Sequence, residues 1–217
     1  MVRSIARTVR LPIAVALLII AFACGVLASD VQTPSCTTAL LVIDVQHIWL
    51  SRGIMYTADN THITDKIAEI LPLARQAGVP VVFIKDVSER GRTPEYRLDM
   101  PVAIAPIDGD YVSEKRVGNA FSYTDLHSML QDLGVTRVLI TGLASHSCVS
   151  DTVWGARVKG YEVVILEDGH TGGSGGRIAE QQNTLWTSQG LGVIASSELD
   201  WDSQCMVGVE ADNSDDL

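Results

Sequence analysis

The feature that most constrains the fold is an alternation of short apolar runs with helical patterns, which begins at Ala39. Five runs are rich in Val, Ile and Leu and end at turn residues: ALLVID, VPVVFIKD, VTRVLITG, YEVVILED and LGVIAS. Unbroken apolar runs are typical of parallel strands that are covered on both faces. The alternation therefore predicts an α/β fold with a doubly wound, mostly parallel sheet and helices on both faces, a three-layer α/β/α arrangement.

The segments between these runs have the spacing of amphipathic helices. It predicts helices over residues 61–77, 122–133, 147–160 and 177–189, with a kink or local adjustment at Pro72 in the first of them. Residues 86–114 do not follow either pattern. We expect them to form a long irregular stretch that borders a cleft.

The first 28 residues form a segment of their own. Arg3, Arg7 and Arg10 precede an uncharged apolar run over residues 11–28, which is the layout of a secretory signal peptide with cleavage before Ser29. An uncleaved membrane anchor is the alternative, because the run is just long enough to cross a bilayer. In both cases we expect the remainder to be exported, either periplasmic or secreted, or held at the membrane if residues 11–28 are retained. Residues 36–200 then form the domain, and residues 206–217 form an acidic, solvated tail.

Charge and cysteine content limit the partners and the redox state. The formal net charge is −10, which disfavours nucleic acid and anionic membrane surfaces, so we expect a small-molecule partner and no membrane contact unless the N-terminal segment is retained. Cys36, Cys148 and Cys205 follow the N-terminal segment, and an odd number leaves one thiol over in an oxidising compartment. Either Cys36 pairs with Cys205 and leaves Cys148 free, or none of the three pairs.

Ligands bind outside the carboxyl ends of the strands in such a sheet, which narrows the search for chemistry. Cys148 opens a predicted helix, whose N-terminus would stabilise a thiolate and lower the thiol pKa. Asp44 could accept the thiol proton, and Lys115 nearby would hold both groups ionised. Each residue also has a structural interpretation: a buried cysteine, a turn cap and a solvated loop lysine. The strand ends in question carry Asp44, Asp86, the turn 142–148 and Asp168.

Three motifs in order favour the chemical interpretation. They are an apolar strand ending in Asp-x-Gln, a lysine shortly before Ala-Phe, and Gly-hydrophobic-small-Ser-x-x-Cys-Val. With these motifs, residues 38–197 resemble the isochorismatase-like cysteine hydrolases, a family that includes nicotinamidases, N-carbamoylsarcosine amidohydrolase and ureidoacrylate amidohydrolases. The residues that carry the motifs are Asp44, Gln46, Lys115, Asn119, Ala120, Phe121, Gly142, Leu143, Ala144, Ser145, Cys148 and Val149.

The resemblance implies a catalytic triad of Asp44, Lys115 and Cys148. It also implies a cis peptide between Leu143 and Ala144, which turns the N–H of Ala144 toward the same point as that of Cys148 and forms an oxyanion hole. The expected reaction cleaves a C–N bond of a small amide or ureido compound through a thioester acyl-enzyme. It requires no cofactor, and a homo-oligomer is common in the family.

The chain departs from the metal-dependent nicotinamidases. These bind a metal through Asp-x-His after the second strand, where this chain reads KDVSERGRTPEY without a histidine, so we expect no metal. His47, Trp49 and Phe121 are candidates for substrate binding, although core packing explains the two aromatic rings equally well.

Four further polar residues near these motifs have structural interpretations, and two alternative functions remain. We interpret His146 and Ser147 as bystanders of the thiol, and Asp168 and His170 as caps of a turn. The alternative functions are vinyl-ether hydrolysis of the isochorismatase type, and a binding or redox-sensing module on the same fold.

Overall fold

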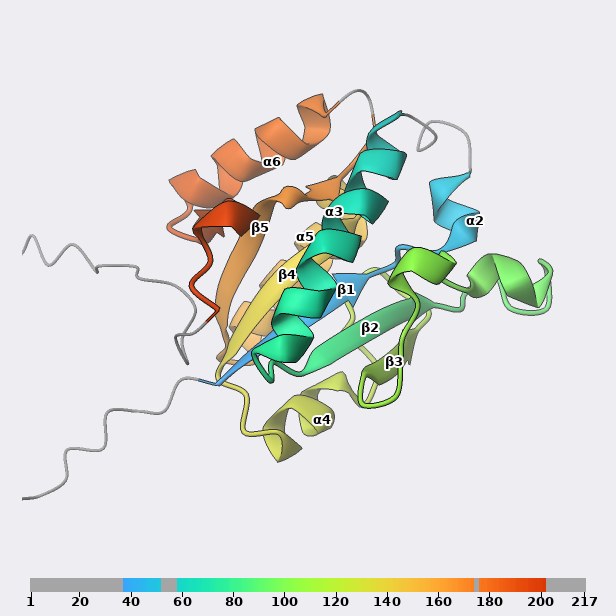
Figure 1. The fold of residues 1–217 in the computed structure, drawn as a ribbon, viewed down its shortest axis with the longest axis horizontal. Coiled ribbons are helices and arrows are strands. Elements are labelled where there is room, and N and C mark those ends of the chain that lie inside the picture. Colours follow the sequence, from blue (N-terminus) through green and yellow to red (C-terminus); the bar gives the residue numbers. More distant parts are fainter. Residues whose placement is uncertain (1–36, 52–57, 174–175, 202–217) are drawn as a thin grey trace, which may run out of the picture. The chain divides into compact units, whose positions relative to one another are not determined.

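The computed structural model describes residues 37–51, 58–173 and 176–201, without the side chains of residues 58–61 (Figure 1). Its sheet has six strands in the spatial order β3-β2-β1-β4-β5-β6, and every neighbouring pair is parallel. The prediction of a doubly wound, parallel α/β sheet is therefore confirmed. The strands are β1 (Thr38–Ile43), β2 (Val81–Asp86), β3 (Tyr111–Lys115), β4 (Arg137–Leu143), β5 (Glu162–Thr171) and β6 (Gly192–Ile194).

Helices cover both faces of this sheet because the side chains of each central strand alternate between them. In β1, Leu40 and Val42 pack with the apolar side of α3, whereas Leu41 and Ile43 pack with α4, α5 and the buried Trp186 of α6. Every residue of β1 is buried, which explains its unbroken apolar run. The helices are α2 (His47–Leu50), α3 (Ala58–Gln76), α4 (Leu126–Asp132), α5 (Ser150–Val158) and α6 (Arg177–Ser188).

The strand order has its switch point between β1 and β4. The chain winds from β1 through β2 to β3 on one side, and from β4 through β5 to β6 on the other. In parallel sheets ligands bind where the winding reverses, outside the carboxyl ends of the strands. The segments that follow β1 and β4, which begin with Asp44 and Ala144, therefore lie at this switch point.

One expectation about the stretch 86–114 is wrong. It was expected to be irregular throughout, but its end joins β3, which pairs with β2 from Val82–Tyr111 to Asp86–Lys115. The inward-facing side chains of β3 are Ser113 and Lys115, so the strand has no apolar run that a sequence pattern could reveal. Lys115 therefore ends a strand and does not belong to a loop.

Two predicted helices differ from the observed ones at their starts. The helix expected over 122–133 begins only at Leu126, because Tyr123 has a left-handed backbone with φ of 61°. The helix expected over 147–160 is a π-helical turn, Ser145–Val149, followed by α5. The other two agree closely with α3 and α6, and α3 continues through Pro72.

The expected signal segment 1–28, the tail 206–217, and the cysteines 36 and 205 lie outside the described residues. Predictions about them stay predictions. Within the described ranges, no helix has both the length and the apolar character needed to cross a membrane.

Candidate active site

Asp44 is the first residue after β1 and begins the turn into α2. Its φ of 55° lies in the left-handed region, which aspartate tolerates better than most residues. The side chain is only 2% exposed, so its carboxylate is held inside the protein. Gln46, two residues later, is fully buried and closes this turn against β2.

Gln46 fixes the end of β2 beside Asp44. Its side-chain Oε1 accepts the backbone N–H of Asp86 at 2.8 Å, and its Nε2 donates to the carbonyl oxygens of Asp86 at 3.1 Å and Leu98 at 2.6 Å. The side-chain amide therefore forms hydrogen bonds with the end of β2 that the backbone of another β1 residue would otherwise form. The glutamine of the first motif thus positions a second strand-end carboxylate, that of Asp86.

Lys115 reaches the same point from the end of β3. Its Nζ lies 2.7 Å from Oδ2 of Asp44 and donates to the carbonyl oxygen of Val117 at 3.1 Å. The side chain crosses the end of β2 to do so, because β2 lies between β3 and β1. The Asp44 carboxylate also lies beside the thiol of Cys148, where it can accept the thiol proton.

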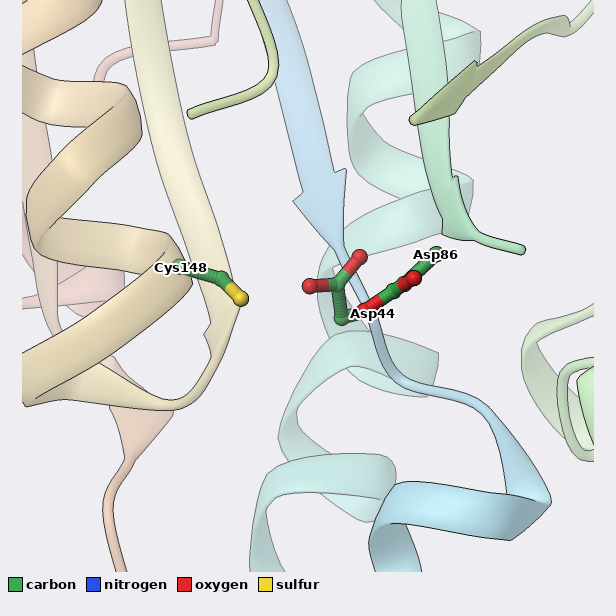
Figure 2. A group of neighbouring side chains, drawn as sticks. All are labelled: Asp44, Asp86 and Cys148. Atoms are coloured by element: carbon green, nitrogen blue, oxygen red, sulfur yellow. The ribbon is translucent and has the colours of Figure 1, made fainter. Parts of the chain in front are cut away.

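Cys148 lies in the π-helical turn between β4 and α5. The Leu143–Ala144 peptide that precedes this turn is cis, as the resemblance implied. The carbonyl oxygen of Ala144 accepts the N–H groups of Ser147 at 2.9 Å and Val149 at 3.2 Å, which folds the turn around the thiol. Cys148 is partly exposed, and Figure 2 shows its Sγ pointing toward Asp44.

The thiol and two carboxylates form one cluster. Sγ of Cys148 and a carboxylate oxygen from each of Asp44 and Asp86 all lie within 4.8 Å of one another (Figure 2). With the ammonium of Lys115 on Asp44, three strand ends and the turn after β4 contribute one group each to the same small volume. The structure therefore brings together all three predicted triad residues and adds Asp86.

Burial and mutual repulsion set the protonation states of Asp44 and Cys148. Burial raises the pKa of Asp44 to about 6, although the charge of Lys115 opposes the rise. Burial and the negative charge of Asp44 raise the pKa of Cys148 to about 11. The sequence-based expectation of a lowered thiol pKa is wrong, because these two effects outweigh the lysine. At neutral pH the site therefore holds a neutral thiol beside an ionised carboxylate, which is the arrangement of a nucleophile and its general base.

Lys115 stays charged in this environment. Burial alone would lower its pKa, but the carboxylates of Asp44 and Asp86, together with Cys148 when it is a thiolate, raise the pKa above the ordinary value. The permanent positive charge favours the ionised form of Asp44 and any thiolate that forms during reaction.

A chain of hydrogen bonds supports the cysteine turn from behind. Ser145, fully buried, lies 2.8 Å from Nδ1 of His170, and Nε2 of His170 lies 2.7 Å from Oδ1 of Asn183. The other side-chain atom of Asn183, Nδ2, donates to the carbonyl oxygen of Glu167 at 3.1 Å. Asn183 must therefore accept from His170 Nε2–H, which leaves Nδ1 to accept the Ser145 hydroxyl proton.

These hydrogen bonds show that the interpretation of His170 as a turn cap was wrong. His170 is 5% exposed, and burial lowers its pKa, which favours the neutral ring that the chain requires. Asp168 does hold a turn, since it accepts the N–H of Ser196 at 2.8 Å and its hydroxyl at 2.6 Å.

The three predicted substrate contacts lie in different surroundings. His47 is exposed at the start of α2, and Trp49 is partly buried against the core on the α3 side. The ring of Phe121 is buried and stacks on Tyr161, with centroids 5.7 Å apart. The structure thus shows core packing for Phe121, and substrate binding by the three stays a prediction. His146, expected to be a bystander, is exposed.

The described residues do not form the metal site of the nicotinamidases. Asp86 and Ser88 occupy the Asp-x-His positions, and the Ser88 N–H is hydrogen-bonded to Oδ1 of Asp86 at 2.8 Å. Asp44, Asp86 and Cys148 offer three close ligand atoms, but the ammonium of Lys115 already contacts Asp44. A divalent ion bound there would face this ammonium, so the donor set does not suit one.

For three residues of this site the sequence predicted no catalytic or positioning role. Asp86 ends VVFIKD as Asp44 ends ALLVID, and that shared position was the available signal for a second carboxylate. Ser145 and His170 meet only through the pairing of β4 with β5, in which His170 lies beside Gly142. A register of this kind has no signal in a single sequence.

Comparisons with known proteins agree with this geometry. The family model of the isochorismatase domain matches residues 38–196. Streptothricin hydrolase of Streptomyces noursei is 34% identical over 137 residues, which cover 61% of this chain and 53% of that protein. An uncharacterised isochorismatase family protein of Bacillus subtilis (strain 168), YddQ, is 30% identical over 137 residues, which cover 61% of this chain and 76% of that protein.

Among solved structures, that of N-carbamoylsarcosine amidase from Thermoplasma acidophilum has the same fold. The TM-score is 0.66 at 24% sequence identity, and the alignment covers 76% of this chain and 99% of that one. The similarity to streptothricin hydrolase, in contrast, spans only about half of that longer protein.

Proposed function

The chain belongs to the isochorismatase family, and from this premise we propose that it is a cysteine hydrolase that cleaves the C–N bond of a small amide or ureido compound. Relatives named as an amidase and as a streptothricin hydrolase support this reaction class. The observation that carries the proposal is the position of the Asp44 carboxylate, which lies 2.7 Å from the ammonium of Lys115 and within 4.8 Å of Sγ of Cys148.

In the first half of the proposed reaction, Asp44 removes the thiol proton as Sγ of Cys148 attacks the substrate carbonyl carbon. The N–H groups of Ala144 and Cys148 then stabilise the oxyanion, which is worth about 3 kcal/mol per donor in comparable sites. Asp44 returns the proton to the leaving nitrogen as the C–N bond breaks. A thioester on Cys148 and a free amine or ammonia result.

In the second half, water replaces the departed amine. Asp44, ionised again, takes a proton from this water while the water oxygen attacks the thioester carbonyl carbon. The oxyanion collapses, the C–S bond breaks, and the proton passes to the thiolate. Lys115 stays charged throughout and stabilises whichever of the two partners carries the negative charge.

The proposal extends to the location of the reaction. The arginine-flanked apolar segment at residues 3–28 supports export, with Ser29 as the new N-terminus. N-terminal sequencing of the protein recovered from outside the cytoplasm tests this. A chain that starts at residue 1 and stays in the cytoplasm would contradict it.

Ammonia release from a panel of small amides and ureides tests the function itself. We expect at least one compound to release ammonia with the wild-type protein and none with Cys148→Ala, whose folding is checked by its unfolding transition. Cys148→Ser serves as the conservative comparison, since it keeps a weaker nucleophile at the same position. Equal release by wild type and Cys148→Ala, or no release from any compound, would contradict the proposal.

A further inference from the structure

The proposed mechanism does not use Asp86, whose buried carboxylate lies beside the nucleophile Cys148. Asp86 ends β2, is 8% exposed, and places an oxygen within 4.8 Å of Sγ of Cys148 (Figure 2). Gln46 holds its backbone on both sides, and its own Oδ1 accepts the N–H of Ser88. The carboxylate is therefore fixed in place before any substrate arrives.

The distance determines what Asp86 can touch. In a reactive complex the substrate carbonyl carbon lies about 3 to 3.5 Å from the attacking atom. An oxygen that lies no more than 4.8 Å from Sγ is then in reach of a group one or two bonds from that carbon. Asp86 is thus placed to contact a substrate that is bound at Cys148.

Of the two carboxylates at the thiol, that of Asp86 forms no ion pair with a lysine or arginine among the described residues. Asp44 and Asp86 are acidic, Cys148 is neutral, and Lys115 is bound to Asp44. The neighbouring cations have other partners. Lys85 points to the other face of β2 and lies 3.1 Å from Asp99, and Arg116 donates to the carbonyl oxygen of Val87 at 3.1 Å.

We propose that Asp86 selects amides that carry a cationic nitrogen next to the scissile carbonyl, with the ammonium donating to Asp86 while Cys148 attacks. This inference rests on the proposed amide hydrolysis for its substrate and names the class of that substrate. A buried, fixed carboxylate pairs strongly with an ammonium because little reorganisation is needed on binding. The same carboxylate repels a substrate with an anionic group in that position.

Three amides test the selectivity by turnover. Glycinamide, propionamide and malonamate all contain the unit CH2–CO–NH2 and differ in bearing an ammonium, a methyl group or a carboxylate. At about pH 7, where an α-amino group is mostly protonated, we expect kcat/KM to be highest for glycinamide and lowest for malonamate. Asp86→Asn should lower kcat/KM for glycinamide about tenfold to a hundredfold, the usual effect of losing a hydrogen bond to a charged group.

The same substitution should change kcat/KM for propionamide less than for glycinamide, so that the ratio of the two values falls. Asn keeps the acceptor for the Ser88 N–H, so the local fold is retained. Asp132→Asn is the matched control, because Asp132 is exposed at the end of α4 and its loss changes the net charge equally. Equal kcat/KM values for glycinamide and propionamide in the wild type, or the same ratio in Asp86→Asn, would overturn the selectivity.

Charged thiol reagents test the selectivity without turnover. The probes are the 2-aminoethyl and 2-sulfonatoethyl methanethiosulfonates, read by mass spectrometry of the peptide that contains Cys148. The measured quantity is the ratio of the modification rates by the cationic and the anionic reagent, divided by the same ratio for the free thiol glutathione. We expect this ratio to exceed one in wild type and Asp132→Asn, and to be lower in Asp86→Asn. A ratio that is the same in all three proteins refutes the inference. If no amide is hydrolysed but the ratio depends on Asp86, the proposed function fails and the cation selectivity stands.

Discussion

At the residue scale, the site depends on one proton shared between Asp44 and Cys148. Burial penalises the charge on either group, and their proximity penalises two charges at once. The pair therefore carries a single negative charge over a wide range of pH, next to the ammonium of Lys115. Its titration belongs to the pair and is seen as two well-separated apparent pKa values.

This pairing predicts an acidic limb in the pH profile of kcat/KM. The pKa of Asp44 is raised to about 6, so the base is ionised above that pH and protonated below it. Activity should fall about tenfold per pH unit below the limb and be flat above it to about pH 9. Asp44→Asn should lower kcat at least about a hundredfold. A profile without a limb near that pH, or an active Asp44→Asn, would count against the role of Asp44 as the base.

Lys115 should set the position of that limb. Its charge lowers the pKa of Asp44 and opposes the effect of burial. Lys115→Met should therefore move the acidic limb to higher pH, in addition to any loss of kcat. Lys85→Met is the control, since Lys85 ends near Asp99 and not near Asp44. A limb that stays in place in Lys115→Met, or moves equally in both variants, would show that the ion pair does not tune the base.

The hydroxyl of Ser145 should act on the rate through the cysteine turn. Ser145→Ala removes the donor to His170, so we expect kcat to fall about tenfold, the effect of about 1.4 kcal/mol, with a smaller change in KM. Ser145→Thr keeps the hydroxyl and should retain most of the activity. Steady-state kinetics of both variants and their melting temperatures separate positioning from stability. Equal kcat losses in the two variants would contradict the positioning role.

At the element scale, the close approach of β1 and β4 requires glycine at position 142. Gly142 has φ of +128°, and a Cβ there would overlap the backbone of Ile43 in the paired strand. No flexible side chain lies in the way that could move aside. The glycine of the third motif therefore allows β1 and β4 to stay paired up to the segments that carry Asp44 and Cys148.

Gly142→Ala should lower the free energy of unfolding by about 2 kcal/mol or more, because both the backbone angle and the contact are unfavourable. Gly192→Ala is the matched control in β6, where the nearest atom would lie at an ordinary contact distance of 3.4 Å. Urea unfolding of the two variants measures the difference. A Gly142→Ala protein as stable as Gly192→Ala would show that the strands can separate at little cost.

The elements differ in how far the sequence could predict them. The central strands β1, β2, β4 and β5 were visible because burial on both faces demands apolar residues in a row. β3 was not visible, since its inward side chains Ser113 and Lys115 are polar and are buried through hydrogen bonds and an ion pair. The π-helical turn at Cys148 was predicted as part of a helix, because sequence patterns do not distinguish the first turn of α5 from the turn before it.

At the scale of the whole molecule, topology assembles the site. Asp44, Asp86 and Lys115 lie at the ends of β1, β2 and β3, and Cys148 lies in the turn that follows β4; these four strands are neighbours in the order β3-β2-β1-β4. The sequence could predict which strand ends carry the site, and the family motifs identified three of the four groups. It could not predict the side-chain contacts between strands, such as the reach of Lys115 across β2, because these depend on register and strand order.

Acylation of Cys148 by p-nitrophenyl acetate tests the joint action of this site most directly, since the activated ester needs no knowledge of the natural substrate. With wild-type protein we expect a burst of nitrophenol, one acetyl group on the peptide that contains Cys148, and a burst rate that follows ionisation of a group near the raised pKa of Asp44. In Asp44→Asn the burst should be lost while the fold is kept. A burst that rises steadily with hydroxide and is unchanged in Asp44→Asn, or acetylation away from Cys148, would contradict the account.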